Sequence, residues 1–244
     1  MRKIFEKNEI LFSILLIVIY VLSNMFCVQN FGVTDYRSVV VNTIFSILFI
    51  LLIIYLKSLS YYGLGKANNP KKFMYFIPLI FIVSVNLWSG ININNSKSEI
   101  ICHVLTMINV GFLEEIIFRG FLFKAMAKDS VKSAIIVTSL TFGIGHIVNL
   151  LNGADFVPTL FQIVSAVSIG FLFVIIFYYS KTLIPCIICH SLINSLSIFN
   201  SDNTILFYIS SIFIIVVAIV YSIIIIKNVK KEELKWLKHI SKEQ

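Results

Sequence analysis

The chain has 244 residues, of which 58% are hydrophobic and 13% are charged. This apolar composition excludes an ordinary soluble domain, and the long apolar runs point to a membrane. The net charge of +8 does not require a nucleic-acid partner, because the basic residues lie mostly in short segments between the apolar runs and in the C-terminal tail.

Eight apolar runs follow one another along the chain. Most approach the length of about 20 residues at which a helix crosses a bilayer, so we expect an all-α, polytopic integral membrane bundle of about eight transmembrane helices. The expected spans are roughly residues 9–28, 38–57, 73–91, 99–124, 132–151, 158–180, 183–199 and 204–226. We expect one domain over residues 1–226 and a basic tail over residues 227–244.

The basic residues are divided unevenly between the two sides of these spans. Of the 20 Lys and Arg residues, 17 lie on the side of the N-terminus, Arg37 and Lys97 lie on the other, and Arg119 lies inside a span. The positive-inside rule predicts a multi-pass protein of the cell membrane with both termini cytoplasmic. The tail is interpreted as a solvated flank rather than an amphipathic helix, and it can lie against anionic headgroups. Membrane lipids, and no nucleic acid, are therefore expected partners.

The first three spans resemble a scaffold, because their interiors hold no charged residue. The first span begins like a signal peptide, but its apolar run is too long and lacks a small-residue cleavage site, so we expect it to remain uncleaved. Asn42 and Asn86 are isolated amides, and we expect them to form hydrogen bonds between helices.

The fourth span carries two adjacent acids, Glu114 and Glu115, followed by Arg119. A charge at membrane depth costs roughly 2.5–3.5 kcal/mol even on a lenient scale, so such residues usually serve a function. Glu115 and Arg119 are four residues apart and share a helix face, which predicts an ion pair. Glu114 lies about 140° from Arg119 around the axis. It should face a different partner and be free to act as a general base.

Two later spans carry polar groups at matching depth. Phe142-Gly-Ile-Gly-His146 places two glycines before a histidine, and these glycines allow a helix or an extended ligand to approach closely. His190 and Asn194 share one helix face and offer two donors, as an oxyanion hole requires. Counted from the nearest cytoplasmic lysines at ~1.5 Å per residue, Glu114, His146, His190 and Asn194 lie ~15, ~21, ~14 and ~20 Å deep. We expect one polar layer, reached from the cytoplasmic side.

In this order, Glu-Glu-x-x-x-Arg, Phe-x-x-x-His and His-x-x-x-Asn resemble the motifs of the CPBP intramembrane proteases. That family includes the type II CAAX prenyl endopeptidases and the bacterial Abi or bacteriocin-immunity proteins. The resemblance covers about residues 99–199. It implies an intramembrane endopeptidase that hydrolyses membrane-associated peptides or proteins.

The resemblance assigns three tasks to six residues: activation of water (Glu114, His146), stabilisation of the oxyanion (His190, Asn194), and maintenance of the site's geometry and charge (Glu115, Arg119). This mechanism requires no cofactor. The family was long described as metalloproteases, and zinc bound by Glu114, His146 and His190 is the alternative. No unpaired carboxylate would then remain as the base.

Two other functions stay open on the residues alone. One is a non-catalytic bacteriocin-immunity or scaffold protein whose pocket binds a peptide or lipid. The other is a transporter or proton relay, which also uses intramembrane acids, although inverted repeats and broken helices are not evident. The Ile-, Lys- and Asn-rich composition is typical of low-GC bacteria, which argues against prenylated substrates and favours peptide pheromone or bacteriocin maturation, or self-immunity. The sequence defines neither the natural substrate nor the oligomeric state.

The remaining candidates receive structural interpretations. Cys186-Ile-Ile-Cys189-His190 spells a haem-attachment signature, but it lies in an apolar helix near the cytoplasmic side, so the cysteines are expected to pack. Cys27 and Cys102 lie near the outer ends of their spans, which permits a disulfide. His103 lies three turns before Glu114 on the same face, where it could support the site, but it is expected instead at the membrane interface.

Overall fold

The computed structural model describes residues 2–151, 153–201 and 203–243, with side chains as far as Val229. It contains seven helices long and apolar enough to span a membrane, and a shorter apolar helix, Ile184–Phe199. The polytopic all-α bundle is therefore confirmed. The shorter helix corresponds to the expected span 183–199.

The elements follow one another with few long connections. In chain order they are α1 (Arg2–Lys7), α2 (Glu9–Asn30), α3 (Tyr36–Leu56), η1 (Pro70–Phe76), α4 (Ile77–Ser84), η2 (Val85–Leu87), α5 (Lys97–Glu115), η3 (Ile116–Phe123), α6 (Lys124–Met126), α7 (Val131–Ile144), η4 (Gly145–Ile147), α8 (Val148–Leu151), α9 (Phe156–Ser180), α10 (Ile184–Leu196), η5 (Ser197–Phe199) and α11 (Thr204–Glu243).

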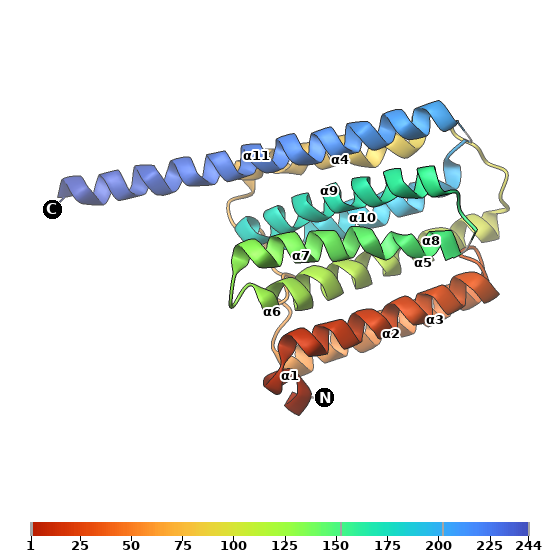
Figure 1. Cartoon of the computed structure of the whole chain (residues 1–244), viewed down its shortest axis with the longest axis horizontal. Helices are drawn as coiled ribbons and strands as arrows, with labels where there is room; N and C mark the ends of the chain where they lie inside the picture. Colours follow the sequence, from red (N-terminus) through yellow and green to blue (C-terminus); the bar gives the residue numbers. More distant parts are fainter. Residues whose placement is uncertain (1, 152, 202, 244) are drawn as a thin grey trace.

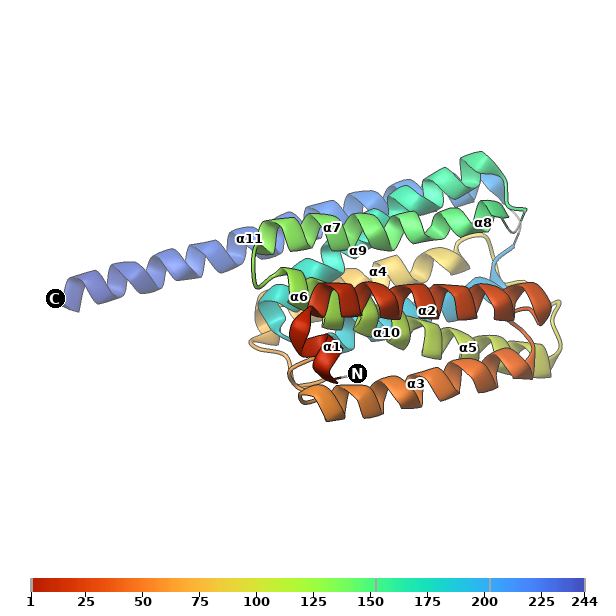
Figure 2. The same cartoon turned by 60° about the horizontal axis from the view of Figure 1, so that its bottom comes forward.

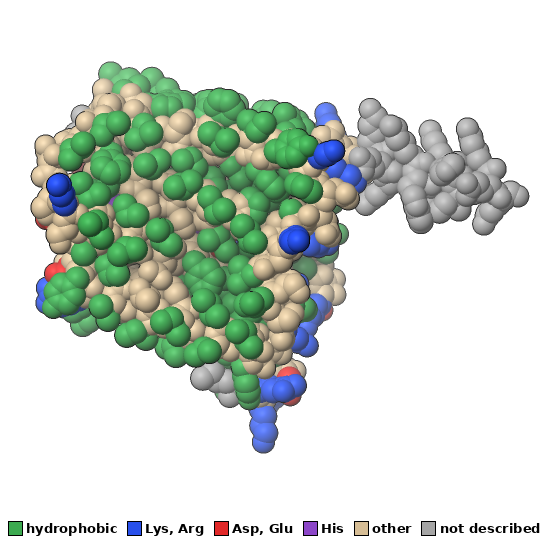
Figure 3. Space-filling view, turned by 180° about the vertical axis from the view of Figure 1, so that it is seen from behind, with side chains coloured by type: hydrophobic (Ala, Val, Ile, Leu, Met, Phe, Trp, Pro, Cys, Tyr) green, Lys and Arg blue, Asp and Glu red, His purple; other side chains and the backbone are tan. Residues whose placement is uncertain are grey.

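The long helices run roughly side by side along one axis of the molecule (Figures 1 and 2). The N-terminus and the turns with Lys57, Lys128 and Lys181 lie at one end, which we call the lysine-rich end. The α2–α3, α4–α5, α8–α9 and η5–α11 connections lie at the opposite end. On the face drawn in Figure 3, most of the visible Lys and Arg side chains lie near the end from which α11 projects, beside a broad hydrophobic surface. This arrangement suits a bundle embedded in a bilayer.

Small residues bring the central helices into contact. A β-carbon on Gly111 of α5 would lie 2.8 Å from the backbone nitrogen of Ser191 in α10, and one on Gly143 of α7 would lie 2.8 Å from that of Val167 in α9. Such close approach is typical of membrane helix pairs. These contacts hold α5 against α10, both of which carry polar motifs, and α7, which leads to His146, against α9.

The two isolated amides differ in what they bind. Asn86 donates to the backbone oxygen of Ile193 in α10, as the prediction of an interhelical bond required. Asn42 instead donates to Ser38 of its own helix, so that prediction was wrong. The reason is that an amide within a helix can reach the carbonyl oxygen four residues earlier.

The basic tail continues α11 beyond the bundle (Figure 1). The side chains on which its amphipathic or solvated character depends lie outside the described residues. Its interpretation stays a prediction.

Candidate active site

A buried ion pair lies at the centre of the polar cluster. Nη1 of Arg119 donates to Oε1 of Glu115 at 3.0 Å, and both side chains are 0% exposed. The guanidinium also lies 4.1 Å from the ring centroid of Phe142 and 5.7 Å from that of Phe173. The expected Glu115–Arg119 pair is confirmed, and the aromatic faces add favourable contacts to its cation.

His190 lies between the two adjacent acids. Its Nδ1 is 3.0 Å from Oε1 of Glu115, and its Nε2 is 3.7 Å from Oε2 of Glu114. If Nδ1 carries a hydrogen, it donates to Glu115, and this bond fixes the orientation of the ring. Nε2 is thereby directed toward Glu114.

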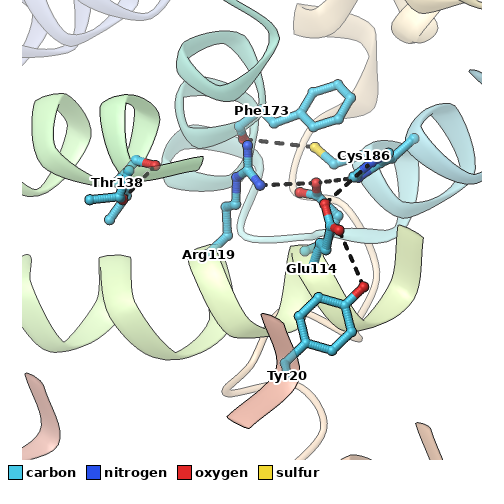
Figure 4. A network of polar contacts seen from close by, with 9 residues as sticks. Tyr20, Glu114, Arg119, Thr138, Phe173 and Cys186 are labelled. Carbon is cyan, nitrogen blue, oxygen red and sulfur yellow. Dashed lines mark hydrogen bonds and ion pairs between the residues drawn. The ribbon is translucent and has the colours of Figure 1, made fainter. Parts of the chain in front are cut away.

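Glu114 has surroundings different from those of Glu115. The hydroxyl of Tyr20 donates to its Oε1 at 3.2 Å, so a residue of α2 reaches the motif of α5 (Figure 4). The side chain of Glu114 is 17% exposed, whereas that of Glu115 is sealed. The two acids therefore face different partners, as their separation around the helix axis predicts.

A cavity of about 550 Å³ joins the motifs of the three helical segments. Glu114, His146, His190 and Asn194 all line it. His146 belongs to the 3₁₀ turn η4, and its ring centroid is 5.9 Å from that of Phe142. The structure thus brings the four predicted groups to one space large enough for part of a peptide.

The two glycines before His146 were expected to allow the close approach of a helix or a ligand, and each does one of these. Gly143 packs against α9, whereas Gly145 lines the cavity and has no atom within 4 Å of the β-carbon it would carry. One glycine therefore allows the approach of a helix, and the other leaves room for a ligand.

The cavity extends away from the lysine-rich end, from which the depth count predicted access. Its lining reaches Val33 and Asn200, which belong to connections at the end opposite the lysine-rich end. Toward the lysine-rich end, the buried side chains of Leu113, Ile117 and Phe121 fill the bundle. Depth counted along each helix does not show at which end of the bundle bulky side chains fill the space between the helices.

Two contributing residues were not assigned to the site from the sequence. Tyr20 was missed in a span interpreted as scaffold, although a tyrosine in mid-span, away from the interfaces where this residue is enriched, was a signal. His103 was expected at the interface but is buried, and its Nε2 lies 3.0 Å from the backbone oxygen of Asn194. It helps to hold the segment that carries Asn194.

The helix changes geometry directly after the paired acids. η3 is a π-helix, and all eight of its residues, Arg119 among them, are buried. The π geometry occurs frequently at functional sites. Here it is found in the segment between the two acids and the lysine-rich end.

The sequence also raised a metal ion and haem as ligands. Among the described residues, no group of three His, Cys, Asp or Glu side chains is placed to hold a metal ion. Zinc held by Glu114, His146 and His190 stays an alternative for experiment. Cys186 and Cys189 are buried with their thiols near backbone oxygens of Phe173 and Leu79, as packing residues. Cys27 and Cys102 are free thiols.

Comparison with known families agrees with the motifs. Residues 96–196 match the family model described as type II CAAX prenyl endopeptidase Rce1-like. Searches of curated proteins and of solved structures gave no match. The matched stretch begins at the N-cap of α5 and contains all six predicted site residues. Over residues 96–196 the chain is thus similar to the Rce1-like family, in agreement with the resemblance to the CPBP and Abi group of intramembrane proteases.

Proposed function

We propose that the protein is an intramembrane endopeptidase in which Glu114 activates the attacking water. The observation that carries this proposal is the unequal placement of the two acids. Glu115 is sealed and paired with Arg119, whereas Glu114 borders the cavity and can reach a bound water. The Rce1-like match supports a CAAX-type intramembrane protease that acts on peptides or proteins.

The chemical step follows from this placement. A water between Glu114 and His146 gives a proton to the carboxylate while its oxygen attacks the peptide carbonyl carbon. The carbonyl oxygen becomes an oxyanion and accepts hydrogen bonds from His190 and Asn194. Glu114 then returns the proton to the departing amine nitrogen, which restores the site.

The contacts of His190 bear on the role given to it. Its Nδ1 lies 3.0 Å from Oε1 of Glu115, whereas its Nε2 is 3.7 Å from Oε2 of Glu114, which is too long for a hydrogen bond. The proposed step therefore requires a hydrogen on Nε2, which the ring would donate to the oxyanion in the cavity that it lines.

The test compares Glu114→Gln with wild type in proteoliposomes. Glu99→Gln is the matched control, since it changes the same residue type in the same helix, outside the cavity lining. Peptides released by cells with and without the gene provide candidate substrates, and mass spectrometry detects their cleavage. Wild type and the control should cleave, while Glu114→Gln stays folded in membranes without cleaving. Full turnover by Glu114→Gln would end the proposal, and folded wild type without cleavage of any candidate would favour the immunity or scaffold alternative.

The cavity direction bears on the substrate. With both termini cytoplasmic, as the lysine distribution predicts, the opening beside Val33 and Asn200 would face the outer side. Exported peptides, such as pheromone or bacteriocin precursors, would then reach the site. Asn200→Cys should react with a membrane-impermeant maleimide added outside intact cells, and Ser60→Cys only after the cells are opened. The reverse pattern would contradict the orientation.

A further inference from the structure

A second pocket, of about 300 Å³, lies at the lysine-rich end. It is formed by the loop after α3, the α6–α7 turn and the end of α9, and it shares no lining residue with the candidate active site. Its lining residues are Ser60, Tyr61, Phe123, Lys124, Ala127, Lys128, Val131, Phe177, Tyr178 and Lys181. The endopeptidase mechanism uses none of them.

The lining carries three lysines and no acidic residue in the part of the chain that is described. Lys128 forms an ion pair with Glu9 at 2.6 Å, and Asp129 follows it in the exposed turn. Lys124 donates to the backbone oxygen of Tyr61 and lies 3.8 Å from the centroid of its ring. Two lysine charges therefore face the pocket without a carboxylate partner among the described ion pairs.

Lys181 also has an unusual backbone conformation. This residue caps α9 with φ = +60°, in the left-handed region where glycine is the favoured residue. A lysine in this conformation carries backbone strain that glycine would not. Its ammonium lies 4.6 Å from the ring centroid of Tyr178, at the pocket wall.

We propose that this pocket binds the phosphate of an anionic membrane lipid. Lys124 and Lys181 would contact the phosphate oxygens. The 14-residue helix α7 begins at Val131 in the pocket wall, so the positive end of its dipole would also favour an anion there. Tyr61 and Tyr178 suit the headgroup level, where amphipathic rings are enriched. Basic pockets between membrane helices on the cytoplasmic side are typical sites for anionic headgroups.

The test uses Lys181→Gly, because glycine removes the charge and suits the backbone conformation. Lys66→Gly is the control, since it removes an exposed charge at the same end that does not line the pocket. The full chain is placed in nanodiscs of phosphatidylcholine with or without phosphatidylglycerol, and lipid retained on release is counted by native mass spectrometry. Wild type and Lys66→Gly should retain phosphatidylglycerol preferentially. Lys181→Gly should lose about fivefold in affinity, the contribution typical of one lysine near an anionic surface.

Equal retention of the two lipids by wild type, or unchanged retention by Lys181→Gly, would overturn the proposal. A third sample distinguishes the source of the phosphate, namely soluble glycerol phosphate added to phosphatidylcholine discs. The unfolding temperature of the protein is measured in all three samples. If glycerol phosphate raises it as much as phosphatidylglycerol does, the lipid is excluded and a soluble phosphate compound is the ligand. These readouts do not depend on proteolysis, so the proposed function and this site can fail separately.

Discussion

Replacing Glu115 by glutamine should destabilise the fold, because this change leaves the cation of Arg119 without a counter-charge in a sealed site. Both side chains are 0% exposed, and Nη1 lies 3.0 Å from Oε1. Breaking a buried ion pair from one side costs about 3–5 kcal/mol. Glutamine still offers an oxygen to Arg119, and the ring of Phe142 stays against the guanidinium. We therefore expect the free energy of unfolding to fall by about 3 kcal/mol, the lower end of that range.

Glu114→Gln is the matched comparison, since it makes the same chemical change one residue away. The amide oxygen of the new glutamine can still accept a hydrogen bond from Tyr20, and the side chain borders the cavity. The free energy of unfolding should therefore fall by less than about 1 kcal/mol. Unfolding in mixed micelles of increasing SDS content, followed by circular dichroism, measures both variants. Adding Arg119→Met to Glu115→Gln should recover part of the lost stability, because an apolar replacement of both partners leaves no buried charge.

The reasoning fails if Glu115→Gln unfolds like wild type, or if Glu114→Gln is destabilised as much. Either result would mean that the two acids have equivalent surroundings. The assignment of one to structure and the other to chemistry would then have no basis.

Three further outcomes are expected. Tyr20→Phe removes the donor to Glu114 and should lower kcat by about fivefold to tenfold, as the loss of a hydrogen bond of ~1–1.5 kcal/mol implies, with the unfolding midpoint little changed. Gly111→Ala should destabilise the bundle, because the new β-carbon would meet the backbone of Ser191. Gly145→Ala should fold normally but cleave less, because the methyl group narrows the cavity. Equal unfolding midpoints for these two variants would contradict the reasoning. A strong chelator should leave cleavage unchanged, and a loss restored only by zinc would overturn the metal-free mechanism.

Much of the fold could be predicted because a bilayer permits few structures. Backbone groups in lipid must pair within their own segment, so each long apolar run predicts a helix whatever its neighbours are. The Glu115–Arg119 pair was likewise a local matter, since residues four apart on a helix meet without knowledge of the tertiary fold. The convergence of Glu114, His146 and His190 followed from their similar depths.

Features that depend on contacts distant in sequence could not be predicted. Tyr20 reaches Glu114 across 94 positions, and no periodicity within α2 marks that contact. The burial of His103 against Asn194 depends on how α5 packs on α10. The blocked lysine-rich end likewise depends on which large side chains meet there, and depth along one helix carries no such information.

Two neighbouring carboxylates can have opposite roles because successive residues of a helix point about 100° apart. On α5 that angle directs Glu115 into the packed side, against Arg119, and Glu114 toward the cavity. His190 then contacts one acid through each ring nitrogen, so the position of α10 relative to α5 sets both distances at once. Gly111 permits that position by leaving room for the backbone of Ser191. A larger residue at 111 should therefore disturb the geometry of the candidate site as well as the stability of the bundle, because it would displace Ser191, the residue next to His190.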